Sequence, residues 1–340
     1  MIMNENYRVK PYQLLAHEAL LRNLKQKYRQ NDTILGNYKK FLAGYKGEIN
    51  VDYKLSLYPH QDHIIIKDLR LKNFSKNFQI DTLLLTKYFL LIIETKNIKG
   101  ELRYDSKQHQ FIQIYNGVEK AYQDPILQAD MQRQNLEYWL QTYNIKIPIE
   151  TLIVSSNPQT IITNIYHDPD IYNKLIRAES LHIYLSKIKN TYKKIYLNQK
   201  RIDELHQLML SKNEPYKPNL IDTYQLTDQY LIKGVPCTEC YKPMTKVYRN
   251  WMCHYCTLSD TEAYKQKIFD YFLLGNDTIT NKECRQLLQI DSPRIANYIL
   301  NAMKLSHQGN NKGRVYLAPV LKEYPQDSMV PIKSHAIINN

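Results

Sequence analysis

The sequence predicts a mixed α/β protein in which helices flank a mixed sheet, followed by a small four-cysteine module and a winged helix-turn-helix-like unit. Two apolar runs within residues 78–94 are typical of buried strands and end in polar residues. Two Cys-x-x-Cys pairs lie within residues 237–256. Beyond them, helix-start signals at residues 280–283 and 292–293 precede a Gly-containing turn at residues 309–313.

The composition favours a partner that carries negative charge. Lys and Arg number 46 against 33 Asp and Glu in 340 residues, which gives a formal net charge of +13. This balance suits nucleic acid, although solubility and a lysine-rich coding bias would also produce it. No apolar run reaches the roughly 18 residues that a membrane span needs, and the first residues lack the apolar core of a signal peptide. We therefore expect no membrane association and a cytoplasmic protein.

Residues 1–210 are predicted to form one α/β domain with a basic, helical N-terminus. Apolar positions at helical spacing predict a helix over residues 11–30, and a second short helix is expected around residues 38–47. Partial alternation of apolar residues over 49–70 predicts a strand, a turn near Pro59 and Asp62, and another strand.

The rest of this domain follows the same α/β pattern. The sequence predicts two strands in residues 78–94, a strand pair in 101–117 with a turn at Asn116-Gly117, a helix over 125–143 and a buried strand over 151–155. Residues 211–235 are polar and contain two prolines, so we expect them to be a linker.

Polar side chains at the tips of the two central strands form the candidate catalytic site. Asp81 follows an apolar strand segment, and Glu94 and Lys96 follow the apolar run 89–93. Carboxylates on adjacent strands can share a divalent ion, because Mg²⁺ prefers hard oxygen ligands. Glu94 and Lys96 are two residues apart and therefore share one face of the strand. An ammonium group there could orient a hydroxide or stabilise the charge of a transition state.

Four separated motifs accompany these residues. They are Gly47-Glu48, then Gln79-Ile80-Asp81, then Ile93-Glu94-Thr95-Lys96-Asn97 with Gly100, and finally Asp124-Pro125-Ile126-Leu127-Gln128. In order, spacing and placement they resemble the NERD (nuclease-related) domain, a branch of the PD-(D/E)xK restriction-endonuclease-like superfamily. The resemblance covers roughly residues 40–160. It implies a restriction-endonuclease-like sheet and a nuclease that uses Mg²⁺ or Mn²⁺ on DNA, in DNA processing, repair or defence.

The resemblance also implies roles for five side chains. Asp81 and Glu94 would bind the catalytic metal ion, and Glu48 would be an accessory metal ligand. Lys96 would act on the attacking water, and Gln128 would assist near the phosphate or the water.

One position departs from the family pattern, and two questions stay open. Thr82 stands where the family often has a histidine, and we expect little effect because no ligand role requires that residue. The alternative function is a non-catalytic nucleic-acid-binding or regulatory protein that retains the nuclease fold. Retention of all four motifs favours the enzyme. Because enzymes of this superfamily often dimerise, a homodimer is one option for the oligomeric state.

Residues 236–258 are predicted to form a zinc ribbon. The ligands would be four cysteines, Cys237, Cys240, Cys253 and Cys256. Four thiolates complete the tetrahedral shell of a structural Zn²⁺ site, with His254 an inferior candidate ligand. Basic and aromatic residues between the pairs could bind nucleic acid or could be ordinary hairpin surface. They are Lys242, Lys246, Tyr248, Arg249 and Trp251.

Residues 259–320 are predicted to form a winged-helix-like domain, followed by a tail over 321–340. Helices are expected over 261–274, from 280 to 288 and from 293 to about 303, with a hairpin over 304–318. The third helix would read nucleic acid and the hairpin would be the wing. The candidate contacts are Arg294, Asn297, Tyr298 and Asn301 in the helix, and Lys312 and Arg314 in the wing. The modest charge of this region leaves a protein partner as the alternative.

Overall fold

The computed structural model describes residues 7–58, 63–74, 76–328 and 330–331 of the chain. Two compact units are present: a sheet unit of residues 1–8 and 43–215, and a ribbon unit of residues 9–42 and 216–340. The predicted turn near Pro59 and Asp62 and half of the predicted tail lie outside the described residues. Among the residues that are described, no helix combines the length and the apolar character needed to cross a bilayer.

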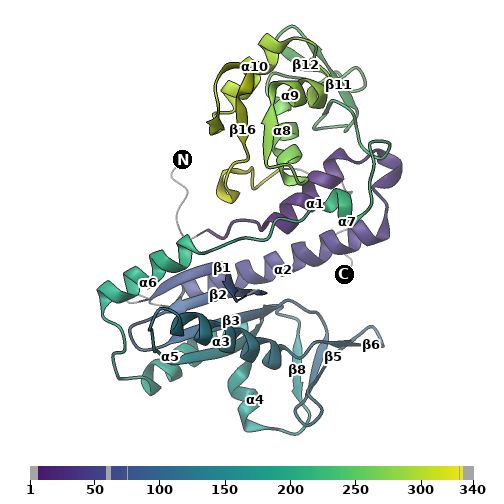
Figure 1. The fold of residues 1–340 in the computed structure, drawn as a ribbon. Helices are drawn as coiled ribbons and strands as arrows, with labels where there is room; N and C mark the ends of the chain where they lie inside the picture. Colours follow the sequence, from purple (N-terminus) through teal and green to yellow (C-terminus); the bar gives the residue numbers. More distant parts are fainter. Residues whose placement is uncertain (1–6, 59–62, 75, 329, 332–340) are drawn as a thin grey trace. The chain divides into compact units, whose positions relative to one another are not determined.

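A five-stranded mixed sheet forms the centre of the sheet unit (Figure 1). In spatial order its strands are β1 (Ile64–Asn73), β2 (Lys76–Leu85), β3 (Leu90–Lys96), β7 (Ile149–Ser155) and β9 (Leu175–Arg177). The first three strands pair antiparallel, whereas β3, β7 and β9 pair parallel. This arrangement confirms the predicted mixed α/β fold.

Helices cover both faces of this sheet. On one face, α3 (Pro125–Gln141) and α6 (Gln199–Ser211) pack on side chains of β1, β2 and β3. On the other, α2 (Asp32–Ser56) and α5 (Leu181–Thr191) pack on β2, β3 and β7. Because both faces are covered, β3 can be apolar over consecutive residues, from Leu90 to Ile93, all of which are buried.

The predicted strand over residues 49–57 is wrong, because these residues continue helix α2. Val51 and Leu55 are buried and lie four residues apart, whereas Ile49 and Tyr53 are 42 % and 58 % exposed. Because exposed and buried apolar residues both occur in this helix, apolar residues fall at every second position and imitate the pattern of a strand. Glu48 therefore lies inside a long helix and not at a helix end.

A smaller sheet completes the sheet unit. Its order is β6 (Val118–Tyr122), β5 (Gln110–Tyr115), β4 (Glu101–Asp105) and β8 (Ile161–Asn164), with α4 (Pro169–Lys174) following. The predicted strand pair over 101–117 is thus present, and the Asn116-Gly117 turn joins its second strand to β6.

The ribbon unit combines the cysteine module with helices from both ends of the chain. Among its described residues it holds the α-helices α1 (Tyr12–Asn23), α7 (Leu220–Thr223), α8 (Ala263–Leu273), α9 (Asn281–Leu288) and α10 (Pro293–Ala302), together with residues 32–42 of α2. One sheet holds β10 (Val235–Pro236), β11 (Pro243–Val247), β12 (Asn250–Met252) and β13 (Ser259–Asp260). Another holds β14 (Thr278–Thr280), β16 (Val315–Leu317) and β15 (His307–Gln308). In the part of the chain that the structure describes, 3-10 turns are formed by Gln26–Tyr28, Ala178–Ser180, Asn311–Gly313 and Leu321–Glu323.

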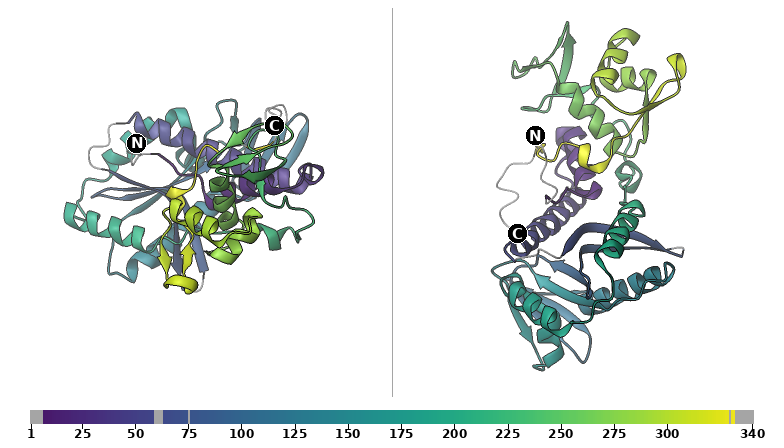
Figure 2. Two further views of the ribbon diagram at one scale, coloured as in Figure 1. Left: turned by 90° about the horizontal axis from the view of Figure 1, so that it is seen from above. Right: turned by 90° about the vertical axis from the view of Figure 1, so that its left-hand side faces the viewer.

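Helix α1 belongs to the ribbon unit, whereas the sequence placed it in the same domain as the central sheet. Tyr12, Leu15 and Ala19 share one apolar core with the ribbon and with α8. The ribbon diagram in Figure 2 shows α1, in purple, beside the green helices of the same unit. At the end of α1, the buried Arg22 guanidinium donates to the carboxylate of Asp270 in α8, with an Nη2–Oδ1 distance of 2.6 Å. A buried ion pair of this kind fixes which helices pair, because either partner alone would be an uncompensated charge.

Gly47 permits α2 to approach the sheet closely. A Cβ at this position would lie 2.6 Å from both Asn97 Cβ and Ser156 Oγ, at the ends of β3 and β7. No real Cβ tolerates such contacts without displacing its neighbours. The glycine therefore sets the distance between α2 and the strand ends that carry the candidate site.

We expect Gly47→Ala to destabilise the sheet unit by about 1–3 kcal/mol, because the added methyl group overpacks this contact. Gly44→Ala is the matched control, since a Cβ there meets nothing within 4 Å in the same helix. It should stabilise the unit by about 0.5–1 kcal/mol through helix propensity. Urea unfolding followed by circular dichroism measures both. Equal stability of the two variants would contradict the close approach.

Candidate functional site

Three carboxylates lie next to one another across the antiparallel strands. The register of β1 and β2 pairs Lys67 with Thr82 and Leu69 with Ile80, which brings Asp68 opposite Asp81. The register of β2 and β3 pairs Thr82 with Ile93, so the next step brings Asp81 opposite Glu94. We call Asp68, Asp81 and Glu94 the carboxylate row. Like charges on neighbouring strands repel, so this row needs compensation.

The backbone at Asp68 is irregular. Its φ of 52° is left-handed, a conformation that Asp tolerates better than most residues. Ile66 and Leu69 belong to the same apolar core although they are three positions apart in the strand, so the alternation of faces shifts at this point. This irregularity places a carboxylate where a regular strand would have continued the apolar pattern.

Asp81 lies at the centre of the carboxylate row. Its Oδ2 accepts a hydrogen bond of 3.0 Å from the backbone N–H of Thr95. Burial raises the pKa of Asp81 well above its ordinary value, and the charges of Glu94 and Glu48 raise it further. Carboxyl groups that raise one another's pKa mark a site of negative potential that a bound cation would relieve.

Glu94 is held by donors from β3 and α3. Its Oε1 accepts from Lys96 Nζ at 2.7 Å and from Gln128 Nε2 at 2.8 Å, and its Oε2 accepts from Gln132 Nε2 at 2.8 Å. Lys96 Nζ also donates to Gln128 Oε1 at 2.9 Å. Asp124 and Pro125 begin α3: the Asp124 carboxylate accepts from the backbone N–H groups of residues 126 and 127 and so caps the helix. The structure thus brings Glu94, Lys96 and Gln128 together as predicted.

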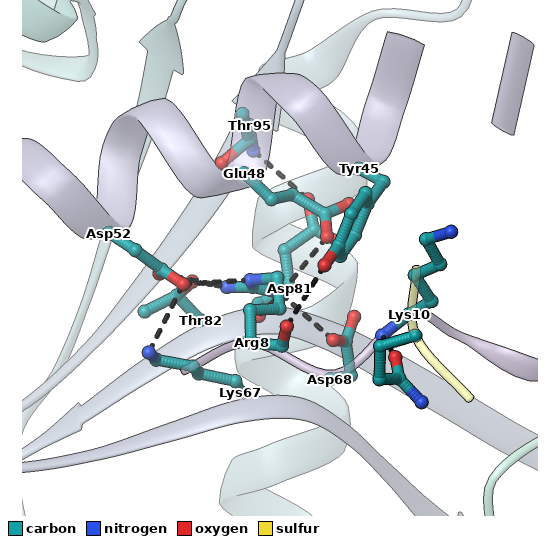
Figure 3. A network of polar contacts seen from close by, with 11 residues as sticks. Arg8, Lys10, Tyr45, Glu48, Asp52, Lys67, Asp68, Asp81, Thr82 and Thr95 are labelled. Atoms are coloured by element: carbon teal, nitrogen blue, oxygen red, sulfur yellow. Dashed lines mark hydrogen bonds and ion pairs between the residues drawn. The ribbon is translucent and has the colours of Figure 1, made fainter. Parts of the chain in front are cut away.

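Glu48 meets Arg8, a residue that the sequence did not single out (Figure 3). Arg8 Nη1 lies 3.0 Å from Glu48 Oε2 and 3.0 Å from Asp68 Oδ2, and Arg8 Nε lies 3.0 Å from Asp52 Oδ2. Burial raises the pKa of Glu48, the negative charge of Asp68 adds to this, and together they bring it to about 7 despite the opposing charge of Arg8.

The carboxylates around Arg8 extend the predicted site. Asp52 follows Glu48 by four residues on α2, and Gln132 follows Gln128 by four residues on α3, so helical spacing was a signal for both. Thr82 was expected to matter little, yet its buried Oγ1 accepts from Arg8 Nη2 at 2.7 Å. No sequence signal pointed to Arg8, since every described hydrogen-bond partner of its side chain lies at least 40 residues away.

The donor set suits a hard divalent cation in kind, since Asp81, Glu94 and Glu48 offer carboxylate oxygens. Among the described residues, however, the only group of three or more His, Cys, Asp or Glu with all ligand atoms within 4.8 Å of one another is the cysteine set of the ribbon. The three carboxylates would therefore have to draw closer to hold one ion, with Glu94 exchanging hydrogen bonds to Lys96 and Gln128 for the metal.

The four predicted zinc ligands do converge. The Sγ atoms of Cys237, Cys240, Cys253 and Cys256 all lie within 4.8 Å of one another, and exposed His254 is outside this group. Sulfur–sulfur distances of 3.4 and 3.5 Å are far longer than the roughly 2.05 Å of a disulfide. Burial raises the pKa of Cys253, but hydrogen bonds from the backbone N–H groups of residues 256 and 255 and from the thiols of Cys240 and Cys256 together lower this pKa to about 7. Such a set fits a zinc ribbon.

The residues of the ribbon that were predicted to contact nucleic acid differ in how exposed they are. Trp251 is only 1 % exposed and belongs to the apolar core, so its ring has no face for a base to stack on. Lys242 and Arg249 are exposed. Their charges lie over the rings of Tyr255 and Tyr248, which are 70 % and 83 % exposed. Lys246 is half-buried over the Trp251 ring. The exposed Tyr248, which the sequence also suggested, and Tyr255, which it did not, are better placed for stacking.

The predicted contacts of the C-terminal unit lie mostly on one exposed helix face. Helix α10 begins at Pro293 after the N-cap Ser292, and it exposes Arg294, Asn297, Tyr298 and Asn301. Asn301 Oδ1 accepts from Tyr316 OH at 2.8 Å, which ties it to β16. Arg314 is half-buried, and Lys312 lies outside the residues whose side chains are described.

Comparison with known proteins identifies one part of the chain. Residues 43–156 match the family described as NERD, nuclease-related domain. No curated protein and no solved structure matches the chain. The matched segment contains Glu48, the carboxylate row, Lys96 and Gln128, whereas Arg8 lies before it.

The raised pKa of Glu48 predicts a pH dependence of stability. A carboxyl group with a higher pKa in the folded chain holds its proton more tightly there, so its contribution is complete below about pH 4.5 and is lost as pH rises through about 7. In buffer free of Mg²⁺ and Mn²⁺, we expect the unfolding free energy to fall by about 1–3 kcal/mol over this interval. Glu48→Gln should flatten the fall. Urea unfolding at pH 5 and pH 8 measures it, and equal pH dependence in both proteins would rule out this assignment.

We expect one zinc ion per chain, because four thiolates close the coordination shell. Cys240→Ser should lower the zinc content several-fold and destabilise the ribbon unit, since metal binding contributes to its folding. Cys284→Ala is the control, because Cys284 is buried but lies outside the thiol group. Elemental analysis of untagged protein measures the zinc. A wild-type chain without zinc would refute the site.

Proposed function

We propose that this chain, whose residues 43–156 are a nuclease-related domain, hydrolyses phosphodiester bonds of nucleic acid with the help of Mg²⁺ or Mn²⁺. The observation that carries the proposal is the placement of Asp81 beside Glu94 and Lys96 on adjacent strands, with Gln128 completing the group from α3. The sequence predicted Asp81 at the tip of its strand, whereas it lies in the middle of β2, and only Glu94 and Lys96 lie at the end of β3. A nuclease-related function follows from the family match, and the catalytic mechanism below is our proposal.

Asp81 and Glu94 would hold the ion, with the Thr95 carbonyl as a further oxygen ligand. When bound, the ion would supply a water of lowered pKa and neutralise charge on the scissile phosphate. Asp81 is suited to this role because its buried carboxyl group gains most from a nearby cation. Glu48 would contribute as an accessory ligand from α2, since its Oε1 accepts no hydrogen bond from the described residues.

Lys96 and Gln128 would act on the water and the phosphate. Lys96 Nζ contacts both Glu94 and Gln128, so it is held beside the metal-binding oxygens and not spread along the surface. Its ammonium group would orient the attacking oxygen and stabilise the negative charge of the transition state. Gln128 would fix the position of Lys96 and donate to the same oxygens once Glu94 has turned to the ion.

DNA is the proposed substrate, on the ground of the family and of the basic chain. We propose that two exposed surfaces bind the DNA through phosphate contacts and base stacking. One is the exposed face of α10, and the other is formed on the ribbon by Lys242, Tyr248, Arg249 and Tyr255. A protein partner of α10 is the alternative. A gel shift of the full chain at low salt that is unchanged by Tyr298→Ala would assign this face to protein. Dimerisation, which would allow cleavage of both strands, is measured by light scattering.

We expect the full-length chain to cleave at least one of supercoiled, duplex or single-stranded DNA, or RNA, when Mg²⁺ or Mn²⁺ is added. Asp81→Asn and Lys96→Gln should each lower the rate by about 100-fold or more, because each removes a charge used in the transition state. Gel electrophoresis of end-labelled substrates measures cleavage and its position.

Arg103→Gln is the control in the same unit, since Arg103 is 43 % exposed and pairs with Glu101 away from the site. It should cleave at the wild-type rate. Activity that persists unchanged in Lys96→Gln would come from a contaminant and would defeat the proposal. Binding of nucleic acid without any cleavage would favour the non-catalytic alternative.

A further inference from the structure

Arg8 reaches into the candidate site from outside the segment that matches the nuclease-related family. We propose that Arg8 is a positioning residue for the proposed reaction, which holds Glu48 where its carboxylate can serve the metal ion. The inference rests on the proposed function, because it takes Glu48 to be an accessory ligand. It adds a residue that the four motifs do not contain.

Among the described residues, all the hydrogen bonds of the Arg8 guanidinium are made to residues around the candidate site. Its side chain has no exposed surface. Nε and Nη2 donate to the two carboxylate oxygens of Asp52 at 3.0 and 3.1 Å, and Nη2 also donates to Thr82 Oγ1 at 2.7 Å. Nη1 donates at 3.0 Å to Glu48, to Asp68 and to the backbone carbonyl of Asp81. Every N–H of the group thus has an acceptor, in the planar geometry that suits guanidinium.

These bonds join three elements at the candidate site. Glu48 and Asp52 come from one face of α2, Asp68 comes from β1, and the Asp81 carbonyl belongs to β2. Carboxylates this close would push α2 away from the strands if they had no counter-charge. The charges of Asp68, Asp52 and Glu48 outweigh burial, which alone would lower the pKa of Arg8, and raise this pKa above its ordinary value. The guanidinium is therefore a permanent cation.

Arg8 is itself fixed in place. The hydroxyl of Tyr45, one turn before Glu48 on α2, donates to the Arg8 carbonyl at 3.0 Å. Arg8 therefore binds α2 through both its backbone and its side chain (Figure 3). One oxygen of Glu48, Oε2, is held by Arg8, and the other is left for an ion shared with Asp81 and Glu94.

Positioning and simple charge balance predict opposite effects on metal binding. If Arg8 only neutralised the carboxylates, its positive charge would oppose a second cation, and removing it would tighten metal binding. If Arg8 positions Glu48, removing it would release the carboxylate and weaken metal binding. Outer partners that orient a ligand typically contribute about 10- to 100-fold in metal affinity.

The test is a double-mutant cycle on the dissociation constant for Mn²⁺, measured calorimetrically on the full-length, zinc-loaded chain without nucleic acid. We expect Arg8→Gln and Glu48→Gln each to raise this constant about tenfold. The double variant should be no more than about twofold weaker than the weaker single variant, because both changes remove the same contribution. Arg8→Lys should also bind weakly, since an ammonium group keeps the charge but cannot span Glu48 and Asp52.

Each outcome separates the two proposals. Tighter Mn²⁺ binding by Arg8→Gln, wild-type binding by Arg8→Lys, or additive effects in the cycle would overturn the positioning role while leaving the nuclease proposal intact. A wild-type chain that binds no Mn²⁺, or binding that is indifferent to Glu48→Gln, would instead remove the premise. If neither Arg8 variant folds, as judged by circular dichroism, Arg8 serves the fold alone and the inference fails. Arg103→Gln should bind Mn²⁺ as the wild type does.

Discussion

The sheet unit depends on bringing like charges together on adjacent strands of a buried sheet and on the helix α2. Five carboxylates, Glu48, Asp52, Asp68, Asp81 and Glu94, contact or perturb one another there. Three cations, Arg8, Lys67 and Lys96, lie against them in ion pairs. Fully ionised, five against three leaves two negative charges, which is the charge of one divalent cation. Burial raises the pKa of Asp81 well above its ordinary value, and the negative charges of Glu94 and Glu48 raise it further.

Two different sets of hydrogen bonds stabilise these buried carboxylates. Glu94 is satisfied by amides and an ammonium group from its own strand and from α3, contacts that an incoming ion could replace one at a time. Arg8 instead forms a rigid set of bonds to residues of three elements. The first kind of contact suits a site that must change partners, and the second suits a support that must stay the same. The site thus combines an exchangeable half with a fixed half.

Much of this arrangement could be predicted from the sequence because it is local. The apolar run before Glu94, the proline and capping aspartate before Gln128, and the cysteine spacing each specify a structure within a few residues. The capping box at Thr280 and the N-cap at Ser292 likewise began helices where predicted. Patterns of this kind succeed because strand burial, helix capping and thiol spacing are short-range constraints.

What the sequence could not provide is long-range or irregular. Alternating apolar residues in 49–57 imitated a strand, because Ile49 and Tyr53 are exposed on a helix whose buried side is carried by Val51 and Leu55. The role of Asp68 could not be predicted, because Asp68 itself adopts a left-handed conformation that interrupts the regular alternation of β1. Arg8 was only one of many basic residues near the N-terminus until the strand register brought its acceptors together. Trp251 has an aromatic ring suited to base stacking, but the ring is packed into an apolar core.

The segment that carries the motifs is narrower than the body that folds. Residues 43–156 end just after β7. The helices α5 and α6, which cover the two faces of the sheet, come later in the chain, as does the edge strand β9. The guanidinium among the carboxylates comes from before it. A chain cut to the motif boundaries would expose apolar strands on both sides and leave its acids without their permanent counter-ion. The segment that the family motifs identify is therefore shorter than the segment that this protein needs in order to fold.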